Sequence, residues 1–277
     1  MIVFIASAFS KDNMGGNQAG VCLLGEAYNA QQKLAVAKQL GFSETAYIST
    51  GKNGFQLEYF TPVAEVPLCG HATIASFVVM RDKLSLDKET YTIETKSGNL
   101  SVTLDGDMVF MEQNKPAFYE TLSKADMAKC FDIEVANDQL PIEIGATGLR
   151  DIMLPVKSLE ILEAMKPNFD EISSISQKFN TVGIHAFSFD GARIVCRNFA
   201  PLYGIPEESA TGTSSCVLAS YLWKNNIVRK KEYTFEQGYA LNSPSEIIVR
   251  LTTSDDNIDQ IVVGGKGYSV GEKLINI

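Results

Sequence analysis

Three side chains in the first half of the sequence could transfer a proton or attack a substrate: Glu44, Cys69 and His71. Because side chains alternate along a strand, Glu44 in the stretch Ser-Glu-Thr-Ala-Tyr-Ile-Ser would share a face with Ala46 and Ile48. A carboxylate that is partly removed from water suits a general base or acid working near neutral pH. The alternative is a solvated glutamate at a strand edge. We take Glu44 as the candidate acid and base.

The stretch Leu-Cys-Gly-His-Ala-Thr-Ile at residues 68–74 has three interpretations. A nucleophile and base pair of Cys69 and His71 is disfavoured, because such partners normally come from separate parts of a chain and need a third orienting group. A two-cysteine epimerase would need a second thiol on the opposite face of the substrate carbon. The third interpretation is a helix N-terminus that binds an anion, with His71 as a hydrogen-bond donor. Its alternative is a histidine that bonds the helix terminus without any ligand.

The sequence contains two copies of one pattern of motifs. The first copy, residues 58–94, includes this stretch, and the second is residues 196–236. Each copy contains Phe-x-Pro, a glycine in a turn of small residues, an apolar segment of helix length, and a strand that begins Tyr-Thr. Gly70 precedes the first of these tyrosines by 21 residues, and Gly212 precedes the second by the same 21. We therefore predict two related halves, each built around one apolar helix.

Each of these two helices is apolar or small at nearly every position, so each should be buried inside its own sheet. The first turn of such a helix must find partners for N–H groups that have none within the helix, and glycine lets a ligand approach them closely. Capping by Thr73, Thr213 or Ser214 is the alternative for either turn taken singly. The repetition favours binding, and the substrate-binding candidates are Cys69, Gly70, Ala72, Thr211, Gly212 and Thr213.

The second half offers no thiol to match Cys69. The corresponding place is Thr211, which is too weak a base without an activating partner. Cys216 follows four residues after Gly212, inside the predicted helix, and should face the core. His185, in Val-Gly-Ile-His-Ala-Phe, is predicted to be a structural residue of a strand. A two-cysteine racemase is therefore the less favoured hypothesis.

Composition excludes several classes of function. The 277 residues have a net charge of −9 and a pI near 4.9, so nucleic acid is not an expected partner. No apolar run reaches the length of a membrane span, and the first residues lack the basic segment of a signal peptide, so we expect a cytoplasmic protein with no membrane partner. Five cysteines without a CxxC pair indicate reduced thiols, and two histidines without HxxxH spacing predict no metal site. No cofactor is expected.

We predict an α+β fold of two pseudo-symmetric domains, each a curved or barrel-like mixed sheet around a central apolar helix. The domains are residues 1–115, with the strand 266–277 as a candidate addition, and residues 116–265, and the active site is expected in a cleft between them. Residues 15–20, Gly-Gly-Asn-Gln-Ala-Gly, indicate a turn. A helix should follow, with Asn29 as its N-cap and Gly41 just after its last residue.

The sequence resembles the phenazine-biosynthesis PhzF-like proteins, a branch of the diaminopimelate epimerase fold, over nearly its whole length. The resemblance implies that fold and a homodimer. It is carried by these motifs: Gly16-Asn17, Ser43-Glu44-Thr45, Phe60-Thr61-Pro62 with Glu65-Val66-Pro67, Cys69-Gly70-His71-Ala72-Thr73, Arg197-Asn198-Phe199-Ala200-Pro201, Gly204-Ile205 with Glu207, Ala210-Thr211-Gly212, and Gln237-Gly238 with Pro244-Ser245.

In the best-understood members of that family, an acidic residue of the Ser-Glu-Thr motif moves a proton between carbons of a dihydro-hydroxyanthranilate without a cofactor. The resemblance implies this role for Glu44, with Gly70 and His71 in contact with the substrate. It also makes Glu208 a catalytic candidate. The family usually has Glu-Asp-Pro-Ala-Thr-Gly-Ser where this chain has Glu-Glu-Ser-Ala-Thr-Gly-Thr at residues 207–213, so Glu208 is one methylene longer than the expected aspartate. This departure bears on the substrate more than on the chemistry.

The leading hypothesis is a cofactor-independent isomerase of a biosynthetic process that moves a proton within a small carboxylated substrate. Its catalytic residues would be Glu44, His71 and Glu208, and it would be a homodimer. One alternative is an amino-acid racemase or epimerase. The other is a non-catalytic protein that binds small carboxylates.

Overall fold

The computed structural model describes residues 1–23, 28–52, 54–132 and 134–276. The chain divides into two compact units, and we name them unit 1 (Met1–Glu112 with Gly264–Ile277) and unit 2 (Gln113–Val263). Each unit has a mixed sheet and a buried helix, so the predicted α+β class with two related halves is confirmed. Within the described parts of the chain, no helix is both long and apolar enough to cross a membrane.

Unit 1 is a barrel that closes on itself. Among its described residues, eight strands pair in the order β8–β7–β6–β4–β3–β2–β1–β17, and β17 pairs with β8 to close the circle. The short strand β5 pairs with β4. The elements are β1 (Ile2–Ala8), β2 (Asn17–Leu23), α1 (Ala30–Leu40), β3 (Thr45–Thr50), β4 (Phe55–Phe60), β5 (Glu65–Val66), α2 (Gly70–Lys83), β6 (Thr90–Thr95), β7 (Gly98–Asp105), β8 (Met108–Gln113) and β17 (Asn257–Leu274).

Unit 2 repeats this pairing scheme. Its strands pair in the order β9–β10–β11–β12–β13–β15–β16, and β14 pairs with β13. The elements are β9 (Ala117–Leu122), α3 (Lys124–Met127), β10 (Ile142–Ala146), β11 (Arg150–Pro155), α4 (Leu159–Ala164), α5 (Phe169–Phe179), β12 (Gly183–Asp190), β13 (Arg193–Ala200), the 3₁₀ turn η1 (Pro201–Tyr203), β14 (Ile205–Glu208), α6 (Gly212–Lys224), β15 (Glu232–Gln237), the 3₁₀ turn η2 (Tyr239–Leu241) and β16 (Ser245–Ser254).

The internal repeat is visible in the register of the strands. In unit 1, the parallel pair β4–β6 places Gln56 opposite Glu94. In unit 2, the parallel pair β13–β15 places Val195 opposite Glu236. The two glutamates occupy matching places in the repeated sequence, so the same residues that reveal the repeat also set equivalent positions in the two sheets. In each half, the helix connects the two strands of this parallel pair.

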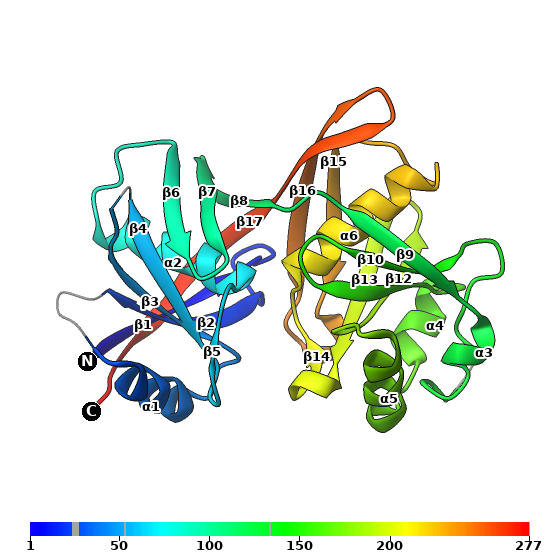
Figure 1. Cartoon of the computed structure of the whole chain (residues 1–277), viewed down its shortest axis with the longest axis horizontal. Coiled ribbons are helices and arrows are strands. Elements are labelled where there is room, and N and C mark those ends of the chain that lie inside the picture. The colour runs from blue at the N-terminus through cyan, green and yellow to red at the C-terminus, as the bar shows by residue number, and fades with distance from the viewer. Residues whose placement is uncertain (24–27, 53, 133, 277) are drawn as a thin grey trace. The chain divides into compact units, whose positions relative to one another are not determined.

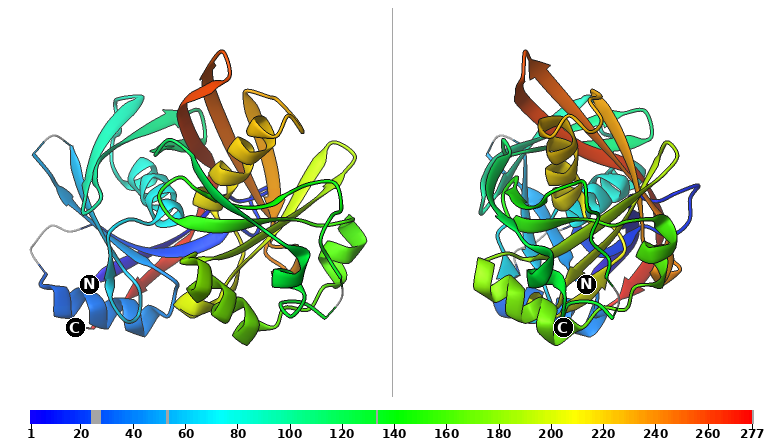
Figure 2. Two further views of the ribbon diagram at one scale, coloured as in Figure 1. Left: turned by 45° about the vertical axis from the view of Figure 1, so that its right-hand side comes forward. Right: turned by 90° about the vertical axis from the view of Figure 1, so that its right-hand side faces the viewer.

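The central helices α2 and α6 are buried, as their composition predicts. Ten residues of each helix are buried, which a helix with no polar face requires. The views of Figures 1 and 2 show α2 (cyan) and α6 (yellow) against the strands of their own units. Buried hydroxyls bond to a carbonyl one turn earlier, as Ser76 does to Ala72 and Ser220 does to Cys216, so polar residues do not interrupt the helices.

The chain passes between the units twice. After β8 it continues into β9 of unit 2, and the single strand β17 begins in unit 2 and returns to unit 1, with the division at Val263 and Gly264. The antiparallel pairing of β1 with β17 then runs from Ile2 opposite Leu274 to Ala8 opposite Gly267. The N-terminal ammonium group donates to the carbonyl of Ile275 (2.7 Å), so the two ends of the chain lie side by side (Figure 1).

In the first 41 residues, the predicted ends of the helix are confirmed, and the predicted turn at residues 15–20 is corrected. Asn29 and Gln32 form the capping box of α1, and Gly41 ends the helix with a φ of 72°. The turn predicted for residues 15–20 is wrong beyond Gly16, because β2 already begins at Asn17, which pairs with Ala8 of β1. Pairing with β1 overrides the weak strand propensity of these residues.

Candidate active site

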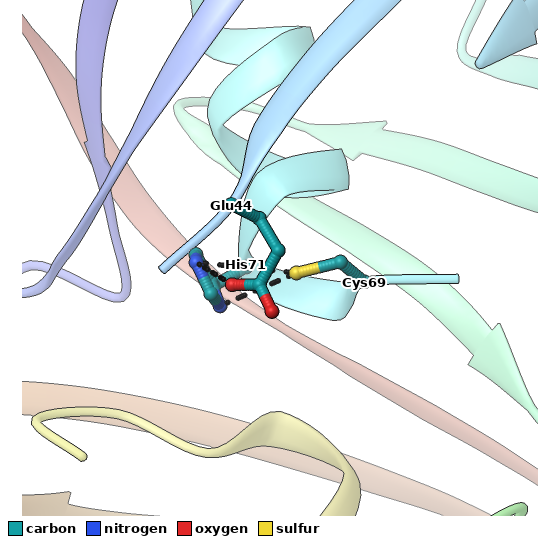
Figure 3. A group of neighbouring side chains, drawn as sticks. All are labelled: Glu44, Cys69 and His71. Carbon is teal, nitrogen blue, oxygen red and sulfur yellow. Dashed lines mark hydrogen bonds and ion pairs between the residues drawn. The ribbon is translucent and has the colours of Figure 1, made fainter. Parts of the chain in front are cut away.

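Glu44 lies directly before β3, and its side chain is only 13% exposed. Its backbone carbonyl accepts a hydrogen bond from the amide of Gly20 (3.3 Å), which ties the segment to β2. The Oε2 atom lies 3.3 Å from Nε2 of His71 and makes no hydrogen bond with a described residue. The alternative of a solvated strand-edge glutamate is therefore wrong. Figure 3 shows the carboxylate directed toward the ring of His71.

His71 lies in the first turn of α2 and is 5% exposed. Besides Glu44, Nε2 faces the hydroxyl of Ser43 (3.3 Å), and Nδ1 faces the side-chain amide nitrogen of Asn17 (3.3 Å). No role was predicted for Ser43 or Asn17. The signal that could have assigned them is their place in the two motifs that also hold Gly16 and Glu44.

The start of α2 is not capped by a side chain. Cys69, the N-cap, is extended and its side chain makes no capping bond. Thr73 donates its hydroxyl to the carbonyl of Cys69 (2.7 Å) and also lies 2.6 Å from the hydroxyl of Tyr59. The capping alternative is therefore wrong for Thr73. Among the described residues, a Cβ added at Gly70 would meet only Met111, at 3.6 Å, so this position has room beside it.

Cys69 completes a cluster with Glu44 and His71. Its sulfur lies 3.5 Å from Nδ1 and 3.9 Å from Nε2 of His71 (Figure 3). Because the two distances are similar, the sulfur lies against the face of the ring and not in line with either nitrogen lone pair. The three residues offer ligand atoms within 4.8 Å of one another. They could hold a metal ion only after the thiol or the ring had turned, so the geometry fits a hydrogen-bonded cluster better than a preformed metal site.

In unit 2, Glu208 lies at the end of β14, close to the start of α6. Its Oε2 atom accepts a hydrogen bond from the hydroxyl of Thr211 (2.7 Å). The amide of the buried Gln237 donates to the carbonyl of Glu208 (2.7 Å) and accepts from the backbone N–H of Thr211 (3.3 Å). Gln237, which had no assigned role in the sequence, therefore fixes the loop that presents Glu208 and Thr211.

Asp151, at the start of β11, is a buried carboxyl group that the sequence did not single out. It is 2% exposed, and its Oδ2 atom accepts a hydrogen bond from Ser214 of α6 (2.7 Å). Burial, opposed by the Ser214 bond and aided by the nearby Glu208, raises the pKa of Asp151 to about 7. Ser214 thus bonds a carboxyl group of the sheet and does not cap α6. The backbone carbonyl of Thr213 accepts a bond from Thr147 (3.2 Å).

The thiols of unit 2 are poor candidates for a second base. Cys216 is fully buried, as predicted, and burial raises the pKa of its thiol well above the ordinary value. Thr211 occupies the N-cap of α6, as Cys69 occupies the N-cap of α2. The position matching Cys69 therefore carries a hydroxyl group that donates to Glu208.

Other residues of the quoted motifs have structural roles. Arg197 makes a two-pronged ion pair with Glu207 (2.8 Å for both contacts) and donates to the carbonyls of Leu162 and Met165. His185 is fully buried in β12, as predicted for a structural strand residue. Arg197 thus holds β14 and the end of α4 against the sheet.

The structure distributes the predicted site residues between the two units. The first set belongs to unit 1 and consists of Glu44, Cys69, Gly70, His71 and Ala72. The second set belongs to unit 2 and consists of Glu208, Thr211, Gly212 and Thr213. Within each set, the side chains that can do chemistry contact one another at the start of the central helix.

Comparisons with known proteins point to one family. A family model described as phenazine biosynthesis-like protein (PhzC-PhzF) matches residues 6–273. An uncharacterised isomerase of Bacillus subtilis (strain 168) is 30% identical over 276 residues, which cover 95% of this chain and 94% of the relative. An uncharacterised isomerase of Escherichia coli (strain K12) is 28% identical over 279 residues and covers the same shares.

Solved structures agree with this match. The crystal structure of a Bacillus anthracis phenazine biosynthesis protein of the PhzF family has a TM-score of 0.91 and 28% identity, and the match covers 100% of this chain and 99% of that one. A probable proline racemase from Agrobacterium radiobacter K84 has a TM-score of 0.67 at 10% identity, with 100% and 93% covered, so it shares the fold alone. The resemblance inferred from the motifs is confirmed.

Proposed function

The chain belongs to the phenazine biosynthesis-like protein family, and we propose that, as an isomerase of this family, it moves a proton between two carbons of a small carboxylated substrate with Glu44 as the acid and base. Its relatives are named isomerases, so the protein is an enzyme of this class. The proposal concerns the catalytic group and the kind of substrate.

The observation that carries the proposal is the environment of the Glu44 carboxyl group. Its Oε2 atom is buried and has no hydrogen-bond partner among the described residues, although buried carboxyl oxygens normally have one. The same oxygen lies beside a buried histidine in the first turn of α2. An oxygen in this state is suited to take a proton from a substrate atom placed against it.

The proton would be moved in two steps. In the first, Glu44 as carboxylate removes a proton from a carbon conjugated to the substrate carboxyl group, and the electron pair of the broken C–H bond is delocalised into that group. In the second, the resulting carboxylic acid returns the proton to another carbon of the conjugated system. Atoms and charge balance without an oxidant, a reductant or a further reactant. The N–H groups at the start of α2 would stabilise the developing negative charge.

The remaining predicted residues would bind the substrate. Gly70 and Ala72 would present backbone donors from α2, and His71 would contribute a side-chain donor. Thr211, Gly212 and Thr213 would do the same at the start of α6, where Glu208 would accept a hydrogen bond from a polar substituent. Cys69 lies against His71 and would shape the pocket around its ring.

The two-cysteine racemase is disfavoured by a specific observation. Its second thiol would have to come from the start of α6, where the N-cap is Thr211 and the nearby Cys216 is buried with a raised pKa. The non-catalytic binding protein would have no use for a buried carboxyl oxygen without a partner. Both alternatives predict that the protein keeps its function without the Glu44 carboxyl group: the racemase would keep its catalytic rate, and the binding protein would keep its affinity for the ligand.

The deciding experiment is the substitution Glu44→Gln, which keeps the shape of the side chain and removes its ability to carry a proton. We expect kcat for proton exchange to fall by at least about 100-fold, the lower end of what a positioned acid or base contributes. The measurement is proton NMR in D₂O with a panel of small dihydroaromatic, amino and hydroxy carboxylic acids, which reports the loss of a C–H signal or the appearance of an isomer.

The matched control is Glu272→Gln, which changes an exposed glutamate of the same unit that pairs only weakly with Lys83 (4.0 Å). This variant should exchange the substrate proton at the wild-type rate. Retention of more than about a tenth of the wild-type rate in Glu44→Gln would contradict the role of Glu44. Binding without exchange in every compound of the panel, seen as line broadening, would favour the binding protein.

A further inference from the structure

The two histidines of the chain each lie beside an asparagine, but the two contacts have opposite polarity. Nδ1 of His71 faces the amide nitrogen of Asn17 at 3.3 Å. Nδ1 of His185 faces the amide oxygen of Asn198 at 3.0 Å. A side-chain amide nitrogen can only donate and its oxygen can only accept, so the two rings must carry their protons on different nitrogens.

The groups around His71 form two sets. Nδ1 faces the amide nitrogen of Asn17, which can only donate a hydrogen, whereas the Cys69 sulfur lies against the face of the ring. Nε2 faces the hydroxyl of Ser43 and the carboxyl oxygen of Glu44, each at 3.3 Å, and both can accept one. The Asn17 donor on one side and the two acceptors on the other are satisfied together only by a ring with a lone pair on Nδ1 and its hydrogen on Nε2.

His185 provides the opposite case inside the same protein. Its Nδ1 must donate to Asn198, and its Nε2 is buried without a partner among the described residues, which suits a nitrogen that carries no hydrogen. Full burial lowers the pKa of His185 to about 4, so this ring stays neutral near pH 7. It is therefore an internal reference for the tautomer with its hydrogen on Nδ1.

Asn17 is held in place by the turn before β2. It is 8% exposed and pairs with Ala8 of β1. Gly16, with a φ of 80°, precedes it, and a Cβ at that position would lie 2.5 Å from the carbonyl of Ala8. Only glycine lets the chain turn this closely against β1, so the position of the Asn17 amide is built into the backbone.

We propose that Asn17 is a positioning residue that keeps His71 in the tautomer with its hydrogen on Nε2, so that the ring N–H lies on the side of Ser43 and Glu44 and His71 cannot act as a second base. The consequence for catalysis rests on the proposed function of Glu44, because a one-base reaction follows only if Glu44 is the base. The substrate of such a reaction needs an acceptor, such as a carboxylate or carbonyl oxygen, where it meets Nε2.

The test is a long-range ¹⁵N–¹H NMR spectrum of the protein labelled at histidine, recorded near neutral pH without substrate. With two histidines in the chain, four ring nitrogens are observed. Each ring nitrogen has either the ¹⁵N chemical shift of a protonated nitrogen or the well-separated chemical shift of a nitrogen with a lone pair. We expect His71 to show the lone pair on Nδ1 and His185 to show it on Nε2, with the Glu44→Gln and His71→Gln variants used for assignment. A hydrogen on Nδ1 of His71, alone or together with one on Nε2, would overturn the proposal.

Two variants test whether Asn17 causes this state. Asn17→Asp replaces the donor by an acceptor and should move the hydrogen toward Nδ1 of His71 or add a second one. Asn17→Leu removes the donor and should give a mixture of tautomers. The His185 signals should stay unchanged in both variants and report that the protein is folded. A His71 spectrum that is unchanged in both folded variants would show that Asn17 does not set the tautomer.

The outcome is independent of catalysis. Should Glu44→Gln keep its activity, the proposed function fails while the spectrum can still show the predicted tautomer. Should Glu44 prove essential while His71 carries its hydrogen on Nδ1, the proposed function stands and the positioning role of Asn17 fails. If the pH dependence of kcat changes in the same Asn17 variants in which the His71 nitrogen shifts change, the tautomer and the catalytic rate are linked.

Discussion

Burial changes the proton equilibria of Asp151 and His185 in opposite directions. The pKa of Asp151 rises to about 7 and that of His185 falls to about 4, because burial disfavours the charged form of each. Asp151 contacts Ser214 in the first turn of α6 and feels the charge of Glu208, so its protonation state is linked to the second set of site residues. His185 lies on the neighbouring strand β12, opposite Met153 of β11, and its Nδ1 faces Asn198.

The first prediction at this scale concerns Asp151→Asn. Between about pH 4 and about pH 7 the folded wild type holds a proton on Asp151 that the unfolded chain has released, so the contribution of Asp151 to stability falls as the pH rises. Asparagine does not titrate and can still accept the Ser214 hydrogen bond. The free energy of unfolding of the variant, relative to wild type, should therefore rise by on the order of 2 kcal/mol from about pH 5 to about pH 8.

Urea unfolding at several pH values measures this difference. The contribution of His185, whose lowered pKa makes stability rise with pH up to about 6.5, is common to both proteins and cancels. A difference between variant and wild type that does not depend on pH would mean that Asp151 is ionised in the folded protein throughout this range.

Among the elements, the turn before β2 and the buried helices place the site. The turn at Gly15 and Gly16 brings Asn17 into β2, and the start of α2 brings His71 against it. At the start of both α2 and α6, the side chain of the N-cap residue makes no capping hydrogen bond. Backbone N–H groups at such a helix terminus can bind an anion, which is the role proposed for both helix starts.

The prediction at this scale concerns Gly16→Ala. The added methyl group would need a φ of 80° and would clash with the hydroxyl of Ser7 and the carbonyl of Ala8, so we expect a loss of about 3 kcal/mol in the free energy of unfolding. The matched control is Gly41→Ala, which has a φ of 72° but no atom near the added methyl group and should lose only about 1 kcal/mol.

Thermal or urea unfolding of both variants measures the comparison. The His71 ring nitrogens should shift in Gly16→Ala, because displacement of β2 moves Asn17, and should stay unchanged in Gly41→Ala. Equal losses of stability in the two variants would show that the close approach to β1 is not what requires glycine at position 16.

In the whole molecule, unit 1 depends on a strand that lies far away in the sequence. The barrel of unit 1 closes only through β17, which pairs with β1 on one side and β8 on the other. The last fourteen residues thus belong to the fold of the first 112. The site of Glu44 and His71 lies in this barrel, so its stability depends on the C-terminal end of the chain.

The prediction at this scale is that deletion of residues 264–277 unfolds unit 1 while unit 2 keeps its structure. Trp223, the one tryptophan of the chain, lies in α6 and reports on unit 2 alone. We expect loss of amide-hydrogen protection in residues 1–112, with little change in tryptophan fluorescence. A synthetic peptide of residues 264–277 should restore part of the protection. Protected amides in β1 of the truncated protein would contradict this prediction.

The sequence by itself determined the repeat, the two buried helices, the caps of α1 and the candidate Glu44. These features depend on residues close in the chain or on two copies of one pattern, so local periodicity and spacing suffice to find them. The family resemblance rests on the same short motifs. Two related halves could be predicted for the same reason, since each copy carries the signals for one complete helix and its flanking strands.

Only the tertiary structure decided which side chains meet. Asn17 and His71 are 54 residues apart, and Asp151 and Ser214 are 63 apart, yet each pair is joined by a buried hydrogen bond. Such contacts depend on strand register and on the close approach of a helix to a sheet, which leave no periodic signal in the sequence. The turn at Gly16 shows the same limit, because pairing with β1 and not local propensity makes Asn17 the first residue of a strand. The role proposed for Glu44 starts from its residue type and its motif, but its orientation toward His71 follows from packing.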